Sequence, residues 1–203
     1  MRWRAYGEHA ALLDCASLTE TIAAHATVSA ARPDGITELV PGARSLLVVE
    51  NPGSGALAAV RELLADADLE HPPEGESREI TLDVTYDGED LELVAQDAGV
   101  STEDVVRLHT GAVYTVAFTG FAPGFGYLTG LPEPLRQPRL PAPRTRVPPG
   151  SVGLAGEFTG VYPRVSPGGW RLIGHTRTVL FDPRADRPAL LAPGDRVRFR
   201  SAG

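Results

Sequence analysis

The spacing of hydrophobic residues along the first third of the chain predicts short strands and two helices. Short apolar runs bounded by Gly or Pro are typical of strands. They occur within residues 2–15, which hold two runs around Gly7, and at 36–40 and 45–50. Apolar positions at helical spacing predict helices at 18–31, behind a Ser17 N-cap, and at 55–66. The order strand-strand-helix-strand-strand-helix is typical of a two-layer α/β sandwich.

A polar stretch at residues 71–77 (HPPEGES) separates this part of the chain from the rest. It holds two prolines and one glycine, and domain boundaries fall in segments of that composition. We therefore expect two domains, a small N-terminal α/β two-layer sandwich at residues 1–76 and a second domain at residues 77–203.

Beyond the polar stretch the pattern becomes mostly strand. Residues 78–88 alternate like a strand, and two helices are expected at 91–100 and 101–111, the second with Ser101 in a capping box. From residue 112 onward, short apolar runs are separated by Gly and Pro. These runs are residues 112–118, 151–158, 170–176, 178–181 and 196–200. The pattern is typical of an all-β barrel or sandwich, so the expected fold class is α+β.

The segment SPGGWRLIGHT at residues 166–176 joins a turn to a strand. Its Pro and Gly residues exclude a helix. Strict alternation from Trp170 places Leu172 on the same face as Trp170, and Ile173 and His175 on the opposite face. We expect Trp170 to enter the barrel core at the start of the strand, and His175 to reach the far rim.

The bulk composition is that of an ordinary soluble globular protein. Of 203 residues, 42% are hydrophobic and 22% are charged. No apolar run approaches the roughly 18 residues that span a bilayer, and none near the N-terminus could serve as a signal peptide. The single cysteine, Cys15, allows no internal disulfide and is expected to be a buried thiol. We therefore expect a cytoplasmic protein.

Charge is distributed unevenly around the net charge of −7. Residues 1–135 contain 7 Arg and 22 acidic residues, whereas residues 136–203 contain 12 Arg and 4 acidic residues. All 19 basic residues are Arg, which excludes Schiff-base and Walker-type lysine chemistry. The basic part can attract anions. Because the whole chain is acidic and its arginines are not interleaved with aromatic residues, no nucleic acid is expected as a partner. Since no apolar run could span a bilayer, no membrane is expected as a partner either.

A glycine-rich segment at residues 119–131, TGFAPGFGYLTGL, contains four glycines and three aromatic residues. The glycines match neither GxGxxG nor GxxxxGK[ST], so the segment is not a phosphate-binding loop. Pro123 with Phe121, Phe125 and Tyr127 instead indicates a fixed loop folded against the mouth of a barrel. The alternative is a tight loop that only packs.

Several blocks, in this order, resemble the family of the B subunit of the prokaryotic 5-oxoprolinase. That family includes sporulation-kinase inhibitor proteins and was long labelled allophanate hydrolase subunit 1. The blocks are residues 105–131, 138–156, 159–163, 166–176, 180–183 and 190–199. They cover the last 100 or so residues closely, and the N-terminal half is similar by its order of elements.

Two departures from the family pattern affect the expected ligand. Gly126 and Thr129 replace a proline and a glycine in the block that usually reads GFxPGFPYLGGL. Glu157 and Phe158 precede Thr159 where the family usually reads GGQTG. If the glutamine amide of relatives contacts the ligand, the identity of the ligand here is open.

The resemblance implies a fold and a reaction. The C-terminal domain would be a cyclophilin-like β-barrel and the N-terminal one a small α/β sandwich. The protein would be the B subunit of an ATP-dependent hydrolase that opens 5-oxo-L-proline to L-glutamate. Its partners would be a related cyclophilin-like C subunit and a separate A subunit, with ATP and magnesium bound by the complex.

The same family leaves an alternative open, a regulatory protein that binds and inhibits a sensor histidine kinase. A neighbouring gene for a C subunit would favour the enzyme, and a neighbouring kinase operon would favour the inhibitor. A peptidyl-prolyl isomerase is a weaker third interpretation, because fold does not imply function.

Arginines at positions 136, 139, 144 and 146 lie between prolines, which hold this segment stiff and extended. Such a segment could bind a carboxylate or phosphate bidentately, or could simply be a solvated basic face. Arg144 matches the family block and is the predicted anion ligand.

The predicted catalytic residues are His109, Arg144 and His175, and no metal site is predicted. His109 ends a helix, where an imidazole is as readily a structural cap, and His175 follows Gly174 at a strand end. Ser151 and Ser166 show no sequence sign of an activating base. The predicted substrate-binding residues are Phe121, Phe125, Tyr127, Thr159 and Tyr162.

Overall fold

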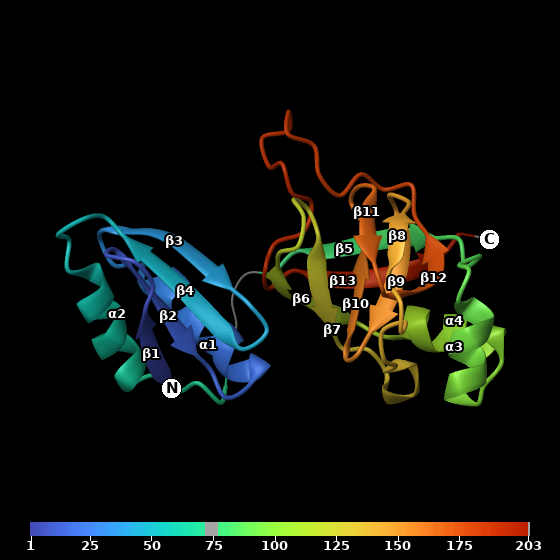
Figure 1. Ribbon diagram of the computed structural model, residues 1–203, viewed down its shortest axis with the longest axis horizontal. Helices are drawn as coiled ribbons and strands as arrows, with labels where there is room; N and C mark the ends of the chain where they lie inside the picture. The colour runs from blue at the N-terminus through green and yellow to red at the C-terminus, as the bar shows by residue number, and fades with distance from the viewer. Residues whose placement is uncertain (72–76, 203) are drawn as a thin grey trace. The chain divides into compact units, whose positions relative to one another are not determined.

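The computed structural model describes residues 1–71 and 77–202. The chain divides into two compact units, Met1–Glu76 and Ser77–Gly203 (Figure 1). The predicted linker at 71–77 lies mostly outside the described residues. No helix in the described ranges is long and apolar enough to cross a bilayer.

The first unit is an α/β sandwich, as the hydrophobic pattern predicts. Its antiparallel sheet has the order β1-β2-β4-β3. The elements are β1 (Arg2–Ala5), β2 (Ala10–Asp14), α1 (Leu18–Ala31), β3 (Ile36–Pro41), β4 (Ser45–Glu50) and α2 (Ala56–Ala65). Ser17 caps α1 by accepting from the Glu20 N–H at 3.1 Å. Side chains of both helices and of β2 and β4 form one core, in which Cys15 is buried as expected.

The second unit contains two helices and a nearly closed β-barrel, which confirms the predicted fold class. Its seven-stranded sheet has the order β12-β9-β10-β7-β6-β13-β5, antiparallel except between β13 and β5. The elements are β5 (Glu79–Val84), α3 (Leu91–Ala98), α4 (Thr102–Gly111), β6 (Tyr114–Thr119), β7 (Gly126–Thr129), η1 (Glu133–Leu135), β8 (Arg144–Val147), β9 (Ser151–Ala155), β10 (Phe158–Val161), β11 (Ser166–Gly168), β12 (Arg171–His175) and β13 (Arg196–Ser201).

The two edges of the sheet meet at one pair of residues. Just beyond the end of β5, Thr85 pairs with His175 of β12 through two backbone hydrogen bonds of 2.8 and 2.9 Å. We call this contact the barrel seam. Because an unpaired sheet edge leaves its backbone groups unsatisfied, the seam completes the ring at this point.

Hydrophobic side chains fill both faces of the sheet. The barrel interior holds Val197 and Phe199 of β13 together with side chains of α3 and α4. Arg198 and Arg200 point outward and pair with Glu79 and Asp83 of β5, as the predicted alternation requires. A second cluster lies on the outer face of the sheet.

The alternation predicted for residues 170–176 holds for Trp170, Leu172 and Ile173, but the expected core position of Trp170 and the expected face of His175 are wrong. Trp170 is buried, with 4% of its surface exposed, but it belongs to the outer cluster, and Ile173 occupies the interior. A register shift between Leu172 and Gly174 marks a β-bulge. Because a bulge inserts one residue, His175 lines a pocket together with Leu172 on one face.

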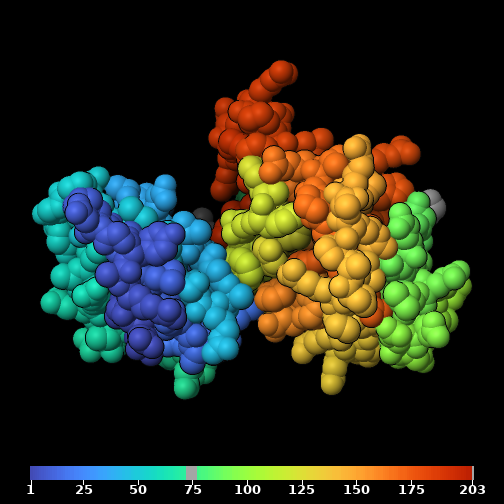
Figure 2. All heavy atoms as spheres, viewed as in Figure 1, coloured from blue at the N-terminus to red at the C-terminus, as the bar shows by residue number. Residues whose placement is uncertain are grey.

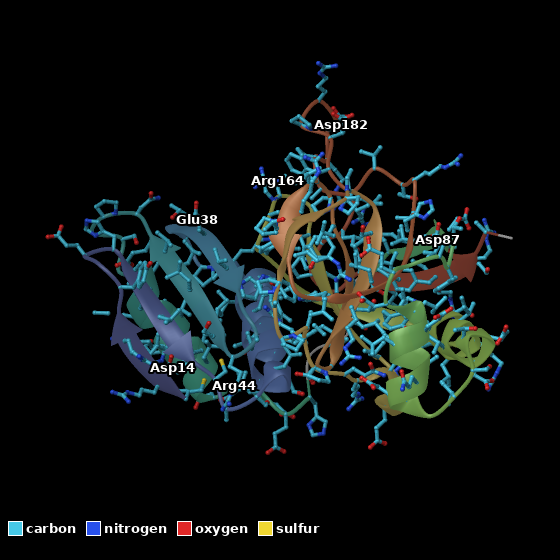
Figure 3. The ribbon with its side chains drawn as sticks, turned by 45° about the vertical axis from the view of Figure 1, so that its right-hand side comes forward. Asp14, Glu38, Arg44, Asp87, Arg164 and Asp182 are labelled. Carbon is cyan, nitrogen blue, oxygen red and sulfur yellow. The ribbon has the colours of Figure 1, made fainter. Side chains whose placement is uncertain are left out.

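Two further predictions about strands need correction. Residues 178–181 form no strand; Phe181 makes only an isolated bridge to Ala189. Part of the segment between β12 and β13, which includes Asp182 (Figure 3), stands out from the body of this unit (Figures 1 and 2), whereas Leu180 and Leu191 of the same segment are buried in the core. The single run predicted at 151–158 is split by a turn into β9 and β10. Strands β8 and β11 pair with each other in a small separate sheet.

Candidate functional site

The outer cluster contains a small pocket walled by aromatic side chains. Four of the five predicted substrate-binding residues line it, and Trp170 completes the wall. Its volume is about 50 Å³, and its lining is Phe121, Phe125, Tyr127, Arg139, Tyr162, Gly168, Gly169 and Trp170. We call it the aromatic pocket. The structure thus brings together residues that lie up to 49 positions apart in the sequence.

Phe125 is the centre of the aromatic pocket and is almost fully buried. Its ring centroid lies 5.0 Å from Tyr127, 5.3 Å from Trp170 and 5.4 Å from Tyr162. All three pairs are close to perpendicular, with interplanar angles of 65–85°. In this geometry the positive edge of one ring meets the negative face of the next, which fixes the walls.

The glycine-rich loop between β6 and β7 carries the mouth of the pocket. Phe121 has φ of 66°, a left-handed conformation that costs energy in a residue with a Cβ. Its side chain is 55% exposed, although its ring still meets Phe125 edge-on at 5.4 Å. Gly124, with φ of 84°, packs against Leu180 and Phe181 so closely that a Cβ would collide with them. The loop is therefore fixed, as its sequence predicts.

Arg139 supplies the positive charge at the aromatic pocket. Burial raises the pKa of Tyr127 and of Tyr162, and the nearby Arg139 guanidinium opposes part of each rise. In the part of the chain that the structure describes, no carboxylate forms an ion pair with Arg139. An exposed guanidinium beside an aromatic wall can bind a carboxylate in the fork geometry that arginine favours.

Arg144, the predicted anion ligand, instead faces carboxylates of its own chain. One terminal nitrogen donates to both oxygens of Asp90, at 2.8 and 2.9 Å, and Nε donates to Glu89 at 3.2 Å. The hydrogen bond to Asp90 raises the pKa of Arg144 further above its ordinary value. Asp90 also accepts from the Leu172 N–H at 2.7 Å. Arg144 therefore clamps the loop before α3 to β8 and β12, and its role as an anion ligand stays a prediction.

His109 and Thr159 lie inside the barrel, not in the aromatic pocket. His109 Nδ1 lies 2.8 Å from the Tyr86 hydroxyl, and its Nε2 lies 3.1 Å from Thr159 Oγ1. Thr159 donates its single hydroxyl proton to the Gly153 carbonyl. Thr159 must therefore accept from Nε2–H, and Nδ1 accepts from Tyr86.

Burial has a large effect on His109. It lowers the pKa of the imidazole to about 3, so the ring is neutral at physiological pH. The ring packs 4.4 Å from Phe199, centroid to centroid. Both ring nitrogens are used within the core, and this geometry is that of a structural histidine.

His175 lies at the barrel seam, beside a second pocket of about 240 Å³. Its Nδ1 is 2.7 Å from Asp87 Oδ1. This pocket shares no lining residue with the aromatic pocket. The three predicted catalytic residues therefore lie in three separate places. His109 is in the buried core, Arg144 is paired with Asp90 and Glu89, and His175 is at the barrel seam.

Three features of these sites lie beyond sequence reasoning. Arg139 lies in the proline-bound arginine segment, but nothing local distinguishes it from Arg144. The wall formed by Trp170 depends on which face of the sheet it occupies, which the bulge decides. Asp87 lies 88 positions from His175, and the two meet only because the barrel closes.

Comparison with known proteins identifies a matching family model and similar relatives. The family model described as carboxyltransferase domain, subdomain C and D, matches residues 1–191. A protein of Escherichia coli O157:H7, named as the B subunit of 5-oxoprolinase, is 49% identical over 168 residues, which cover 81% of this chain and 77% of that protein. The protein of the same name in Bacillus subtilis (strain 168) is 39% identical over 182 residues, covering 81% and 75%.

Several solved structures are also similar to this chain. A crystal structure of the protein TTHA0988 superposes with a TM-score of 0.82 at 36% identity, covering 97% of this chain. This chain spans only 40% of the length of that one. Kluyveromyces lactis urea carboxylase, at 20% identity, shares the fold, with a TM-score of 0.72 over 99% of this chain and 22% of its own.

Proposed function

The chain belongs to the family of the carboxyltransferase domain, subdomain C and D, together with the 5-oxoprolinase B subunits, and from this premise we propose that it is the B subunit of an ATP-dependent 5-oxoprolinase. The complex would hydrolyse 5-oxo-L-proline to L-glutamate, with this chain acting beside a related C subunit and a separate A subunit. The names of the relatives support the subunit role, and the reaction and the partners are our extension of those names.

The observation that carries this proposal is a guanidinium beside an aromatic wall. The proposed substrate is a small five-membered lactam that bears one carboxylate. Its ring would lie against Phe125 and Trp170, and its carboxylate would pair with Arg139. The aromatic wall and the single guanidinium are the groups that would face a small ring-bearing anion.

Tyr127 and Tyr162 would act on the lactam carbonyl. Since burial raises the pKa of both phenols, they stay protonated at neutral pH and can donate hydrogen bonds. Amide resonance makes a lactam unreactive, and attack on its carbonyl carbon develops negative charge on the oxygen. Fixed donors aimed at that oxygen stabilise the charge in the transition state.

The described residues of this chain contain no cluster of metal-binding side chains and no lysine for a phosphate group. No group of three or more His, Cys, Asp or Glu side chains converges among residues 1–71 and 77–202, and the sequence has no lysine. We therefore expect the complex to bind ATP through another chain, and this chain to bind and orient the lactam.

Reconstitution tests the proposal directly. The chain is purified together with its genomic C-subunit and A-subunit neighbours and is supplied with ATP, magnesium and 5-oxoproline. We expect glutamate release coupled to ATP consumption, and neither from a mixture that omits this chain. A complete, folded mixture that releases no glutamate would remove the 5-oxoprolinase assignment.

A further inference from the structure

The pocket at the barrel seam, which we call the seam pocket, is a second site with chemistry of its own. It is lined by Asp87, Gly88, Glu89, Pro148, Pro149, Ser151, Leu172, Gly174 and His175. Its side chains include a hydroxyl, an imidazole and carboxylates, the groups of nucleophilic catalysis. The proposed lactam chemistry of the aromatic pocket uses none of them.

Asp87 holds the imidazole of His175 in one orientation. Asp87 stands on the loop that follows β5 (Figure 3), and its Oδ1 lies 2.7 Å from His175 Nδ1. An ionised carboxylate only accepts hydrogen bonds, so Nδ1 carries the proton and Nε2 of the neutral ring is a free base. In the described ranges no protein group bonds to Nε2.

Ser151 on β9 lies directly opposite His175 on the adjacent strand β12. The backbone N–H and C=O of His175 are both bonded to Thr85 on the other side, so Ser151 and His175 form a non-hydrogen-bonded pair. In such pairs the Cα atoms lie about 4.5 Å apart and the side chains project together on one face of the sheet.

The hydroxyl of Ser151 is unusual for a buried serine. The residue is only 6% exposed, and no hydrogen-bond partner for its Oγ occurs in the described part of the chain. Among the same residues, every fully enclosed side-chain oxygen has a partner, as buried hydroxyls normally do, so this Oγ opens onto the pocket. It makes no hydrogen bond to His175 here, and it can turn about a single torsion, as in unliganded sites whose bonds tighten with substrate.

The loop that carries Asp87 is fixed to β12 before the carboxylate by the Thr85–His175 backbone pair, and after it by Gly88 and Asp90. A Cβ at Gly88 would collide with the backbone of Leu172 and Gly174, so only glycine fits there. Asp90 N–H donates to the Leu172 carbonyl at 2.9 Å, and the Asp90 carboxylate accepts from the Leu172 N–H. These contacts hold Asp87 beside the imidazole before any ligand binds, which is the preorganisation that a catalytic group needs.

We propose that Ser151, His175 and Asp87 form an acyl-transfer site, with Ser151 as nucleophile, His175 as general base and Asp87 as the orienting carboxylate. Ser151 Oγ bonds to the carbonyl carbon of an ester while its proton passes to His175 Nε2. The ester C–O bond then breaks, and the leaving oxygen takes that proton. Water attacks the acyl-serine in the same way, which releases the acid and restores the hydroxyl.

The lining of the seam pocket selects the class of substrate. Pro148, Pro149 and Leu172 form an apolar wall, and Asp87 places a carboxylate at the rim, whereas the carboxylate of Glu89 is paired with Arg144. Like charges repel at such a rim. The substrate is therefore a small acyl ester without negative charge, in contrast to the anionic ligand of the aromatic pocket. This proposal does not depend on the lactam reaction, since the isolated chain can be tested.

A serine-directed fluorophosphonate tests the site without a known substrate. Attack forms an Oγ–P bond and expels fluoride, and the adduct is located by peptide mass spectrometry. We expect one adduct, on Ser151, at a rate that falls about 100-fold in His175→Ala, the scale of general-base catalysis. Asp87→Asn should also slow labelling, and Ser151→Ala should abolish it.

Ser166→Ala is the matched control, because Ser166 lies on β11 outside the seam pocket and should label like wild type. Melting curves confirm that each variant is folded, and p-nitrophenyl acetate should give a burst of p-nitrophenol that Ser151→Ala lacks. Absence of an adduct on the folded wild-type chain overturns the proposal. So does an adduct on another residue, or a labelling rate in His175→Ala equal to that of wild type.

Discussion

At the scale of single residues, the environment decides what each chemical group can do. His109 and His175 have the same side chain, and sequence reasoning treats them alike. His109 is enclosed by the barrel core, which holds its imidazole neutral. His175 lies on the rim with one ring nitrogen fixed and the other open. The first histidine bonds only within the core, and the second has the open ring nitrogen that the proposed acyl-transfer site requires.

The burial of His109 predicts a pH dependence of stability. Its pKa is about 3 in the folded state against an ordinary value of 6.5, so the neutral form is favoured in the folded state. Its contribution is present above about pH 6.5 and declines as the pH falls toward 3, by about 1.4 kcal/mol per pH unit. Urea melts at a series of pH values should show this slope in wild type and lose it in His109→Gln.

His9→Gln provides the control for that series, because His9 is exposed. Its unfolding free energy should follow the wild-type curve at every pH. Parallel curves for wild type and His109→Gln would show that the buried imidazole is not the source of the slope.

Truncation of Trp170 and of Phe121 should destabilise the protein to very different extents. Trp170 is 4% exposed in the outer cluster, so Trp170→Ala should lower the free energy of unfolding by about 3–5 kcal/mol. Phe121 is 55% exposed, so Phe121→Ala should cost less than about 1 kcal/mol. Urea midpoints of the two variants decide this, and a Trp170→Ala midpoint within error of wild type would contradict burial of the indole in the outer cluster.

At the scale of elements, the barrel seam depends on a close approach of two backbones. Gly174 of β12 faces the Thr85 carbonyl and Tyr86 Cα, and a Cβ at this position would collide with the first and crowd the second. Loops and strands can meet this closely only where one side has no side chain. The seam therefore fixes the positions of both His175 and the loop that carries Asp87.

Gly174→Ala should destabilise the barrel, by about 1–3 kcal/mol for overpacking against the backbone. Gly111→Ala is the matched control, because nothing lies within 4 Å of a Cβ placed at the end of α4. It should be neutral or slightly stabilising. Thermal melts of both variants test this, and equal effects would mean that the seam is not tightly packed.

The elements also show how far local sequence can predict this fold. Periodicity and capping predict the helices, and apolar runs predict most strands. The pattern fails where distant contacts decide: at the bulge after Leu172, and at residues 178–181, which pair only through Phe181 and Ala189. The family resemblance, and not the local pattern, singles out Arg144 as the anion ligand, and its ion pair with Asp90, 54 positions away, lies beyond the reach of local sequence.

At the scale of the whole chain, the two units each contain their own hydrophobic core. The core of the first unit lies within residues 1–71, and both clusters of the second lie within residues 77–202. All residues that line the aromatic pocket and the seam pocket belong to the second unit. The proposed chemistry is therefore confined to that unit.

A fragment of residues 77–203 should fold alone, because none of its core side chains comes from the first unit. We expect a cooperative melt and the same rate of fluorophosphonate labelling at Ser151 as in the full chain. Circular dichroism and mass spectrometry measure these two properties. A fragment that shows no cooperative transition would count against two independent units.

Arg139 is the residue on which the proposed function depends most, because it would bind the lactam carboxylate in the aromatic pocket. Steady-state kinetics of the reconstituted complex with Arg139→Ala and Arg146→Ala tests this role most directly. Both arginines are exposed on the same proline-bound segment, but only Arg139 lines the pocket. We predict that Arg139→Ala lowers kcat/KM for 5-oxoproline by about 10- to 100-fold, the scale of a lost charge-assisted hydrogen bond. Arg146→Ala should change it by less than about twofold, and equal losses in two folded variants would contradict the assignment of the pocket.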